Sequence, residues 1–259
     1  MGEVMFYDLT KRLTVSVVVI FIIAFLIFFS QFIYVKWFIV FVLAVIAAIG
    51  AYEYAVLSRL EQKYDLVVFA AAVVLAHYFN LHYPVLALAV AFFFVRQFSN
   101  IESGFSEVAK RFFGLMYVAL PLAMVMSILF VGKWWVVYLL VVTKSVDVFA
   151  YFGGRFIGKR KLAAQLSPSK TVEGAIIGFV SAVVVSVIFS FFHLLSLNES
   201  LILGGLIGVI AQLGDLAESL LKRSVGAKDS NRLPGLGGIL DMVDSLLFTI
   251  PLLYLYLFL

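Results

Sequence analysis

The stretch VEGAIIGFVSAVVVSVIFSFFHLL, residues 172–195, decides the class of fold, because no Asp, Glu, Lys or Arg follows Glu173 within it. A helix needs about 20 predominantly apolar residues to cross a hydrocarbon core of roughly 30 Å. The chain contains nine candidate stretches of this kind, and we expect an all-α integral membrane protein with about nine transmembrane helices. The candidates are Leu13–Phe29, Trp37–Leu57, Leu66–Leu81, Val85–Phe98, Phe112–Val131, Trp134–Phe152, Val172–Leu195, Leu201–Leu221 and Ile239–Leu259.

The composition of the chain agrees with a membrane protein. Of its 259 residues, 64% are hydrophobic and 13% are charged, against about 25% charged in a typical soluble domain. Cysteine is absent, which excludes disulfides, thiolate metal sites and cysteine nucleophiles. The first apolar stretch follows Glu3 and Asp8 without a small-residue cleavage site, so we interpret it as a retained span and not a signal peptide.

The distribution of positive charge predicts the orientation. With nine spans and a cytoplasmic N-terminus, sixteen of the 19 Lys and Arg residues lie in cytoplasmic segments or helix ends. Lys36 and Lys133 remain outside, and Lys144 lies within a span. This is the bias expected of a positive-inside protein. The bias survives if the short third and fourth candidates form a re-entrant pair, so a re-entrant pair stays open.

Two long cytoplasmic segments, Gly153–Thr171 and Lys222–Gly238, are basic and rich in Gly, Ser and Pro, whereas the outer connections are short. We expect function to reside in these segments. We therefore divide the chain into an N-terminal transmembrane region, residues 1–131, and a C-terminal catalytic transmembrane region, residues 132–259.

Acidic side chains lie inside the spans near these two segments. Asp147 is three residues from Lys144, and Asp241 is three residues from Asp244, so each pair shares a helical face. Asp215, Glu218 and Lys222 share a face in the same way. Structural ion pairing between helices would also explain them. Carboxylates beside basic, Gly-rich loops nevertheless favour Mg²⁺ and phosphate chemistry, in which positioning and charge neutralisation suffice without His or Cys.

Five motifs then carry a resemblance. They are DVFAYFGGR (147–155), SPSKTVEG (167–174), GDLAES (214–219), SLLKRSVGAKD (219–229) and PGLGGILDMVDS (234–245). In this order they closely resemble the signature of phosphatidate cytidylyltransferases, also called CDP-diacylglycerol synthases. The resemblance extends from about Trp134 to Ser245, and before Trp134 it rests only on hydropathy.

The resemblance implies an enzyme that transfers a cytidylyl group from CTP to phosphatidic acid, with Mg²⁺ or Mn²⁺ and a monovalent cation as candidate cofactors. The implied metal ligands are Asp215, Asp241 and Asp244. The implied catalytic residues are Asp215, Lys222, Arg223, Lys228, Asp229, Asp241 and Asp244. The implied substrate-binding residues are Asp147, Arg155, Ser167, Lys170, Thr171, Glu173, Gly237 and Gly238.

Three departures from the family pattern bear on activity. Leu236 stands where the family usually has His, Met242 stands where it usually has Arg, and the stretch between Asp229 and Pro234 is one residue shorter. These departures leave open a divergent enzyme or a homologue that binds without turnover. A CDP-archaeol synthase and a polyprenol kinase use similar groups on a different lipid and stay open as well. From another class, a cation-coupled transporter also carries Asp and Lys residues within its spans.

The implied partners are CTP, phosphatidic acid and membrane lipids, with no nucleic acid. We expect a multi-pass protein of the inner (cytoplasmic) membrane whose active site faces the cytoplasm. The glycines at 204, 205 and 208 permit close helix packing, which leaves both internal packing and a homodimer open.

Overall fold

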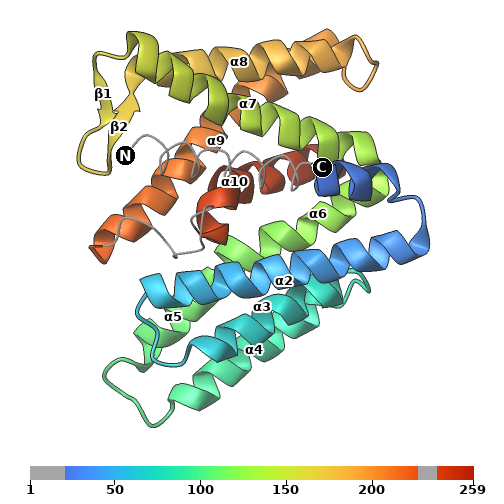
Figure 1. Cartoon of the computed structure of the whole chain (residues 1–259). Coiled ribbons are helices and arrows are strands. Elements are labelled where there is room, and N and C mark those ends of the chain that lie inside the picture. Colours follow the sequence, from blue (N-terminus) through green and yellow to red (C-terminus); the bar gives the residue numbers. More distant parts are fainter. Residues whose placement is uncertain (1–20, 227–237) are drawn as a thin grey trace, which may run out of the picture.

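The computed structural model describes residues 21–226 and 238–259, and most of this part of the chain is helical (Figure 1). Within these described residues, six helices are long and apolar enough to cross a membrane. They are α2 (Ile33–Leu57), the continuous run α5–η1–α6 (Gly104–Gly114, Leu115–Ala119 and Leu120–Val131), α7 (Lys133–Ile157), α8 (Val172–Ser190), α9 (Leu197–Ser224) and α10 (Ile239–Phe258). The predicted all-α, multi-pass membrane class is therefore confirmed.

The predicted number of nine spans remains a prediction. The first candidate falls largely outside the described residues, although residues 21–28 are helical. The third and fourth candidates correspond to α3 (Lys63–His77) and α4 (His82–Gln97), which have 15 and 16 residues. At 1.5 Å per residue each is about 22–24 Å long, which is shorter than a typical hydrocarbon core.

The helices form two groups with α9 and α10 between them (Figure 1). Helices α7 and α8 lie on one side, and α2, α3, α4 and α5 lie on the other. The buried apolar residues form two cores, and α10 contributes to both, because Leu240 and Leu247 pack in one core and Ile250 and Leu253 pack in the other. The helix that carries Asp241 and Asp244 is thus held in place by both apolar cores.

The first basic segment differs from its prediction as a loop over Gly153–Thr171. Helix α7 continues to Ile157, and an antiparallel hairpin follows, formed by β1 (Lys161–Ala163) and β2 (Ser167–Thr171). The glycines here serve close packing between helices and not a loop. A Cβ on Gly153 would lie 2.6 Å from Ile177 Cδ1, and one on Gly174 would lie 2.6 Å from the Ala150 carbonyl oxygen. Helix α9 likewise continues to Ser224, so Lys222 and Arg223 are helical.

Candidate active site

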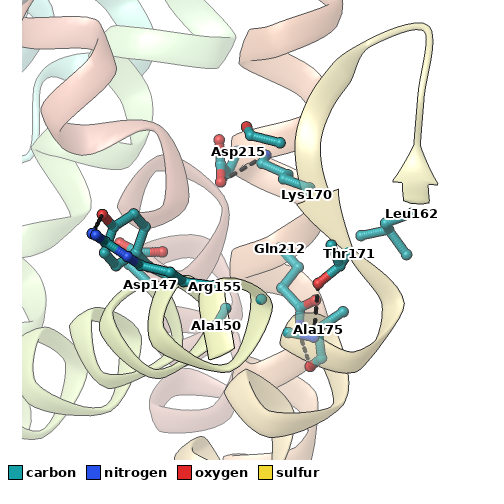
Figure 2. Close-up of a pocket in the computed structure, with 13 residues that line it drawn as sticks. Asp147, Ala150, Arg155, Leu162, Lys170, Thr171, Ala175, Gln212 and Asp215 are labelled. Carbon is teal, nitrogen blue, oxygen red and sulfur yellow. Dashed lines mark hydrogen bonds and ion pairs between the residues drawn. The ribbon is translucent and has the colours of Figure 1, made fainter. Parts of the chain in front are cut away.

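A cavity of about 470 Å³ lies between the C-terminal half of α7, the hairpin, the start of α8 and α9 (Figure 2). Its polar lining combines acidic, basic and amide side chains. Five residues predicted for the site line it, and they are Asp147, Arg155, Lys170, Thr171 and Asp215. Since these residues come from two helices and a strand, the fold and not the local sequence brings them together.

Lys170 and Asp215 form an ion pair across this cavity. Lys170 Nζ on β2 lies 2.7 Å from Asp215 Oδ2 on α9, and Figure 2 shows the contact as a dashed line. The two side chains are 24% and 36% exposed. The Lys170 ammonium nitrogen itself is covered in this ion pair, so a ligand that carries phosphates and a cation would contact it by separating it from Asp215.

The start of α8 forms another wall of the cavity. Thr171 caps this helix, because its Oγ1 accepts a hydrogen bond of 3.1 Å from the Gly174 N–H. Gly158 allows the chain to pass closely, since a Cβ there would lie 2.6 Å from Thr171 Oγ1. Thr171 and Gly174 both line the cavity. The positive end of the α8 dipole therefore adds to the Lys170 and Arg155 charges and favours an anion here.

Asp147 connects α7 to the first turns of α10. Its Oδ2 accepts hydrogen bonds from Lys144 Nζ at 2.9 Å and from Ser245 Oγ at 3.1 Å. Lys144 Nζ also donates to the Met242 carbonyl oxygen at 3.1 Å. Asp147 thus pairs with Lys144, which shares its helical face as predicted, and the pair fixes the cavity wall against the helix that carries Asp241 and Asp244.

Helices α9 and α10 cross in close contact next to Asp215 and Asp244. A Cβ on Gly214 would lie 2.7 Å from the Asp244 carbonyl oxygen, so only glycine permits this crossing. Asp215 directly follows Gly214 and therefore lies at the same crossing as Asp244. Asp244 is 8% exposed, and its neighbour Ser245 donates a hydrogen bond of 3.1 Å to Asp147 Oδ2. Asp147, Asp215 and Asp244 therefore gather around one helix crossing.

Asp241, by contrast, belongs to a buried ion-pair cluster. Lys222 Nζ lies 2.5 Å from Glu218 Oε2 and 2.7 Å from Asp241 Oδ1. Asp241 Oδ2 accepts the Gly238 N–H at 3.0 Å and so caps α10. The Glu218 side chain is only 1% exposed. In this conformation Asp241 is occupied by Lys222 and Gly238 and does not join Asp215 and Asp244.

The predicted metal site of Asp215, Asp241 and Asp244 is accordingly not preformed. In residues 21–226 and 238–259, no group of three or more His, Asp or Glu side chains converges in a way that would hold a metal ion. The sequence placed Asp241 and Asp244 on one helical face, which is correct. Their different environments come from Lys222 on α9, a contact that helical spacing within α10 does not report.

Two further predicted residues lie outside the cavity lining. Glu173 accepts the N–H groups of Lys159 and Arg160, at 3.0 and 3.1 Å, and thereby fastens the connection between α7 and β1. Ser167 Oγ contacts Ser169 Oγ at 3.4 Å.

The remaining predicted residues belong to the second basic segment. Arg223 Nε donates to the Leu166 carbonyl oxygen at 3.2 Å and so ties the end of α9 to the hairpin. Gly238 occupies the N-cap of α10. Lys228, Asp229 and Gly237 lie outside the described residues.

Sequence reasoning missed two polar residues that help to build the site. Gln212 lines the cavity, and its amide donates to the carbonyl oxygens of Ala175 and Gly208 at 3.1 and 2.8 Å. Its signal was an amide three residues before Asp215, and therefore on the same helical face. Glu53 contacts the start of α10, and its signal was a single acidic residue within the apolar stretch of α2.

Comparison of the sequence with known proteins assigns the chain to a family. The model of the cytidylyltransferase family matches residues 10–259. The chain belongs to this family. A phosphatidate cytidylyltransferase of Chlamydia pneumoniae is 30% identical over 283 residues, which cover 96% of this chain and 92% of the relative. One of Helicobacter pylori is 35% identical over 254 residues, which cover 96% and 91%. One of Bacillus subtilis is 47% identical over 129 residues, about half of each chain.

Membership of the cytidylyltransferase family extends beyond the motifs. The family match begins at residue 10, whereas the motif resemblance begins near Trp134. Helices α2 to α6 are thus part of the family unit and not an unrelated anchor. This agrees with the way α10 packs in both apolar cores.

Proposed function

We propose that the protein transfers the cytidylyl group of CTP to phosphatidate and forms CDP-diacylglycerol and pyrophosphate. The observation that carries the proposal is the cavity in which Lys170 faces Asp215 beside the start of α8. It supplies positive charge and the positive end of a helix dipole for phosphates in a chain of cytidylyltransferase type. An oxygen of the phosphatidate phosphate attacks the α-phosphorus of CTP, the bond to the β-phosphate oxygen breaks, and pyrophosphate leaves.

The cavity residues supply positioning and charge neutralisation, which dominate this kind of reaction. Lys170 and Arg155 neutralise phosphate oxygens, and the N-terminus of α8 adds its dipole. The attacking phosphate is already ionised near neutral pH, so no general base is required. Gln212 and the cap at Thr171 hold the walls in place through their hydrogen bonds to the backbone.

Although no three carboxylates converge in the described residues, two carboxylates together with the phosphates of a bound substrate are a donor set that fits a divalent cation such as Mg²⁺ or Mn²⁺. Asp147 Oδ1, Asp215 Oδ1 and Asp244 Oδ2 make no hydrogen bond or ion pair with the described residues, and carboxylate oxygens are the ligands that Mg²⁺ prefers. Asp215 and Asp244 would hold the ion, with Asp147 as a further candidate. A cation bound there would neutralise phosphate charge. Without the cation, Lys144 and Lys170 balance the negative charges of Asp147 and Asp215.

The proposed location is the inner membrane, with the N-terminus and the cavity on the cytoplasmic side. The support is the concentration of Lys and Arg on that side. Because the chain has no cysteine, Ser167→Cys and Ser196→Cys give an unambiguous test with an impermeant thiol reagent. In intact cells Ser196→Cys should react and Ser167→Cys should react only after permeabilisation. The reverse pattern would refute the orientation.

Turnover is tested with the purified protein in detergent, Mg²⁺ and CTP labelled at the α-phosphate, and a parallel assay with CTP labelled at the γ-phosphate detects phosphoryl transfer. Phosphatidate should yield labelled CDP-diacylglycerol, while a polyprenol and an archaeal ether-lipid phosphate should yield little product. Product from the polyprenol alone would indicate a kinase, and product from the ether lipid alone would indicate a CDP-archaeol synthase. CTP binding without any product would indicate a non-catalytic homologue.

A further inference from the structure

The start of α10 rests on a buried carboxylate from the opposite end of the chain. Glu53 lies on α2 and is 1% exposed. Its Oε1 accepts the N–H of Ile239 at 2.9 Å, and its Oε2 accepts the N–H of Leu240 at 2.8 Å. One side chain of the N-terminal region therefore satisfies two backbone donors of the helix that carries Asp241 and Asp244.

These two donors have no partner within the helix itself. The first N–H groups of an α-helix lack carbonyl acceptors in the preceding turn. Asp241 Oδ2 takes the N–H of Gly238 at 3.0 Å, and Glu53 takes the next two. Negative charge at this end of a helix is also favoured by the helix dipole. The first turn of α10 is thus fastened at three successive backbone positions by carboxylates.

The contacts of Glu53 restrict both the rotation and the depth of α10. Leu240 is fully buried in the core that includes α2 and α3, and on the opposite side Lys144 holds the Met242 carbonyl oxygen. Asp244 follows within one turn and lies at the crossing with Gly214. A small shift of this turn would move the Asp244 carboxylate relative to Asp215.

A buried carboxylate in an apolar helix carries a desolvation cost that an apolar residue would avoid. Glutamine at the same position would offer one acceptor oxygen in place of two, and it would leave a backbone N–H without its partner. The geometry therefore requires a carboxylate at this position and not merely a side chain of that size.

We propose that Glu53 is a positioning residue that holds Asp244 opposite Asp215 for divalent-cation binding and turnover. Only the turnover measurements in the test of this inference rest on the proposed function. If α10 loses this anchor, turnover should fall and the cation should bind more weakly. The affinity for CTP should change little at saturating Mg²⁺, because Glu53 does not line the cavity.

The test compares Glu53→Gln with Glu107→Gln. Glu107 is a matched control, since its side chain is 5% exposed and pairs with Arg111 at 3.2 Å on α5. Misplacement of a catalytic group by about 1 Å can lower the rate about 100-fold, so we expect Glu53→Gln to lower kcat by about 10- to 100-fold. The Mg²⁺ concentration for half-maximal rate should rise, and KM for CTP should stay within about twofold of the original protein. Glu107→Gln should lower Tm without these changes.

Two measurements do not depend on turnover. Amide hydrogen exchange at Ile239 and Leu240 should be faster in Glu53→Gln than in the original chain, and Mn²⁺ affinity measured by electron paramagnetic resonance should be lower. If the original chain proves inactive, the proposed function fails, and Mn²⁺ affinity alone decides the inference. Unchanged kcat, Mg²⁺ dependence and Mn²⁺ affinity, with faster exchange, would show a purely structural cap and overturn it.

Glu53→Asp covers the case in which Glu53→Gln does not fold. Aspartate keeps the charge and both acceptor oxygens but is one methylene shorter. We expect its kcat and Mn²⁺ affinity to lie between those of the original chain and those of Glu53→Gln. If Glu53→Gln cannot be purified, the kcat and Mn²⁺ affinity of Glu53→Asp should be clearly lower than those of the original chain. Values equal to the original for a folded Glu53→Asp, together with unchanged amide exchange, would refute the positioning role.

Discussion

Helix α9 contributes acidic or basic side chains to two acid–lysine clusters, about one turn apart along the helix. The two clusters differ in how far their side chains are exposed. The cavity pair, Lys170 and Asp215, faces an open cavity with side chains 24% and 36% exposed. The brace, which consists of Glu218, Lys222 and Asp241, is closed, with side chains 1%, 14% and 20% exposed. Residue types and spacing are similar in both. The surroundings decide which acid meets a ligand and which one joins helices.

The two clusters also differ in what they connect. The cavity pair joins α9 to the hairpin, a surface element that leaves space beside it. The brace joins α9 to the first turn of α10, where Asp241 also caps the helix. The cavity pair should therefore affect turnover first, and the brace should affect stability first.

The largest effect is expected at the carboxylates of the α9–α10 crossing. Asp215→Asn and Asp244→Asn each remove a charge with little change of shape, and each should lower kcat at least about 1000-fold, equal to roughly 4 kcal/mol. Tm and elution in detergent should stay near those of the original chain. Asp65→Asn is the control, because Asp65 pairs with Arg96 on α4, at 2.9 Å and away from the cavity. Original turnover for both variants at limiting Mg²⁺ would remove these residues from the metal site.

The brace should respond mainly in stability. Lys222→Met leaves Glu218 buried beside Asp241 without a cation, and such a change costs about 3 kcal/mol or more. The prediction is a clear fall in Tm, partly restored by adding Glu218→Gln, since the double variant removes the uncompensated charge. Asp241→Asn should lower both Tm and turnover, because it weakens the brace and the α10 cap together. If Lys222→Met kept its Tm and lost only turnover, Lys222 would act on substrate.

A third variant sharpens the comparison on the hairpin itself. Lys170→Gln removes the cation that faces Asp215, and we expect kcat to fall about 100-fold, within the range for one preorganised donor. Lys161→Gln on β1 is the matched control, because Lys161 is exposed and does not line the cavity. Equal effects of the two variants in the CTP assay would show that the hairpin needs only net charge, and not Lys170 in its place.

The sequence predicted the helices well because apolar length is a local property. It also predicted that Lys144 and Asp147, three residues apart, share one helical face, and the two form an ion pair. It did not predict the hairpin, since the glycines at 153 and 154 suggested a loop, whereas they allow α8 to approach α7 closely. The sequence alone does not distinguish a glycine in a loop from a glycine at a contact between helices, because the difference lies in the packing partner.

The site was predicted in part for a similar reason. Asp147, Arg155, Lys170, Thr171 and Asp215 were expected to bind substrate or metal, and all of them line one cavity. The placement of Asp241 depends on Lys222, and the contact of Glu53 with Ile239 joins residues 186 positions apart. Such distant contacts follow from how two apolar cores share α10, which the pattern of a single helix does not contain.

The smallest effect concerns Met242, which lies between Asp241 of the brace and Asp244 of the crossing. The motif resemblance implies Arg at this position and His at that of Leu236, and Arg offers a bidentate fork to phosphate that Met does not. The backbone of Met242 is already fixed by Lys144, so an arginine side chain would start from an ordered position. Leu236 lies outside the described residues.

We therefore expect the original chain to be slow but active, and Leu236→His with Met242→Arg to raise kcat at least about tenfold, equal to about 1.36 kcal/mol. Met242→Lys is the control, because lysine restores the charge without the planar fork. It should give a smaller gain if geometry matters as well as charge. The measurement is CDP-diacylglycerol formation from labelled CTP at saturating Mg²⁺, beside the Helicobacter pylori relative. Equal rates for the original chain and that relative would show that these two positions do not limit turnover. A gain from Met242→Lys as large as that from the double variant would show that positive charge alone, next to the brace, is what the original chain lacks.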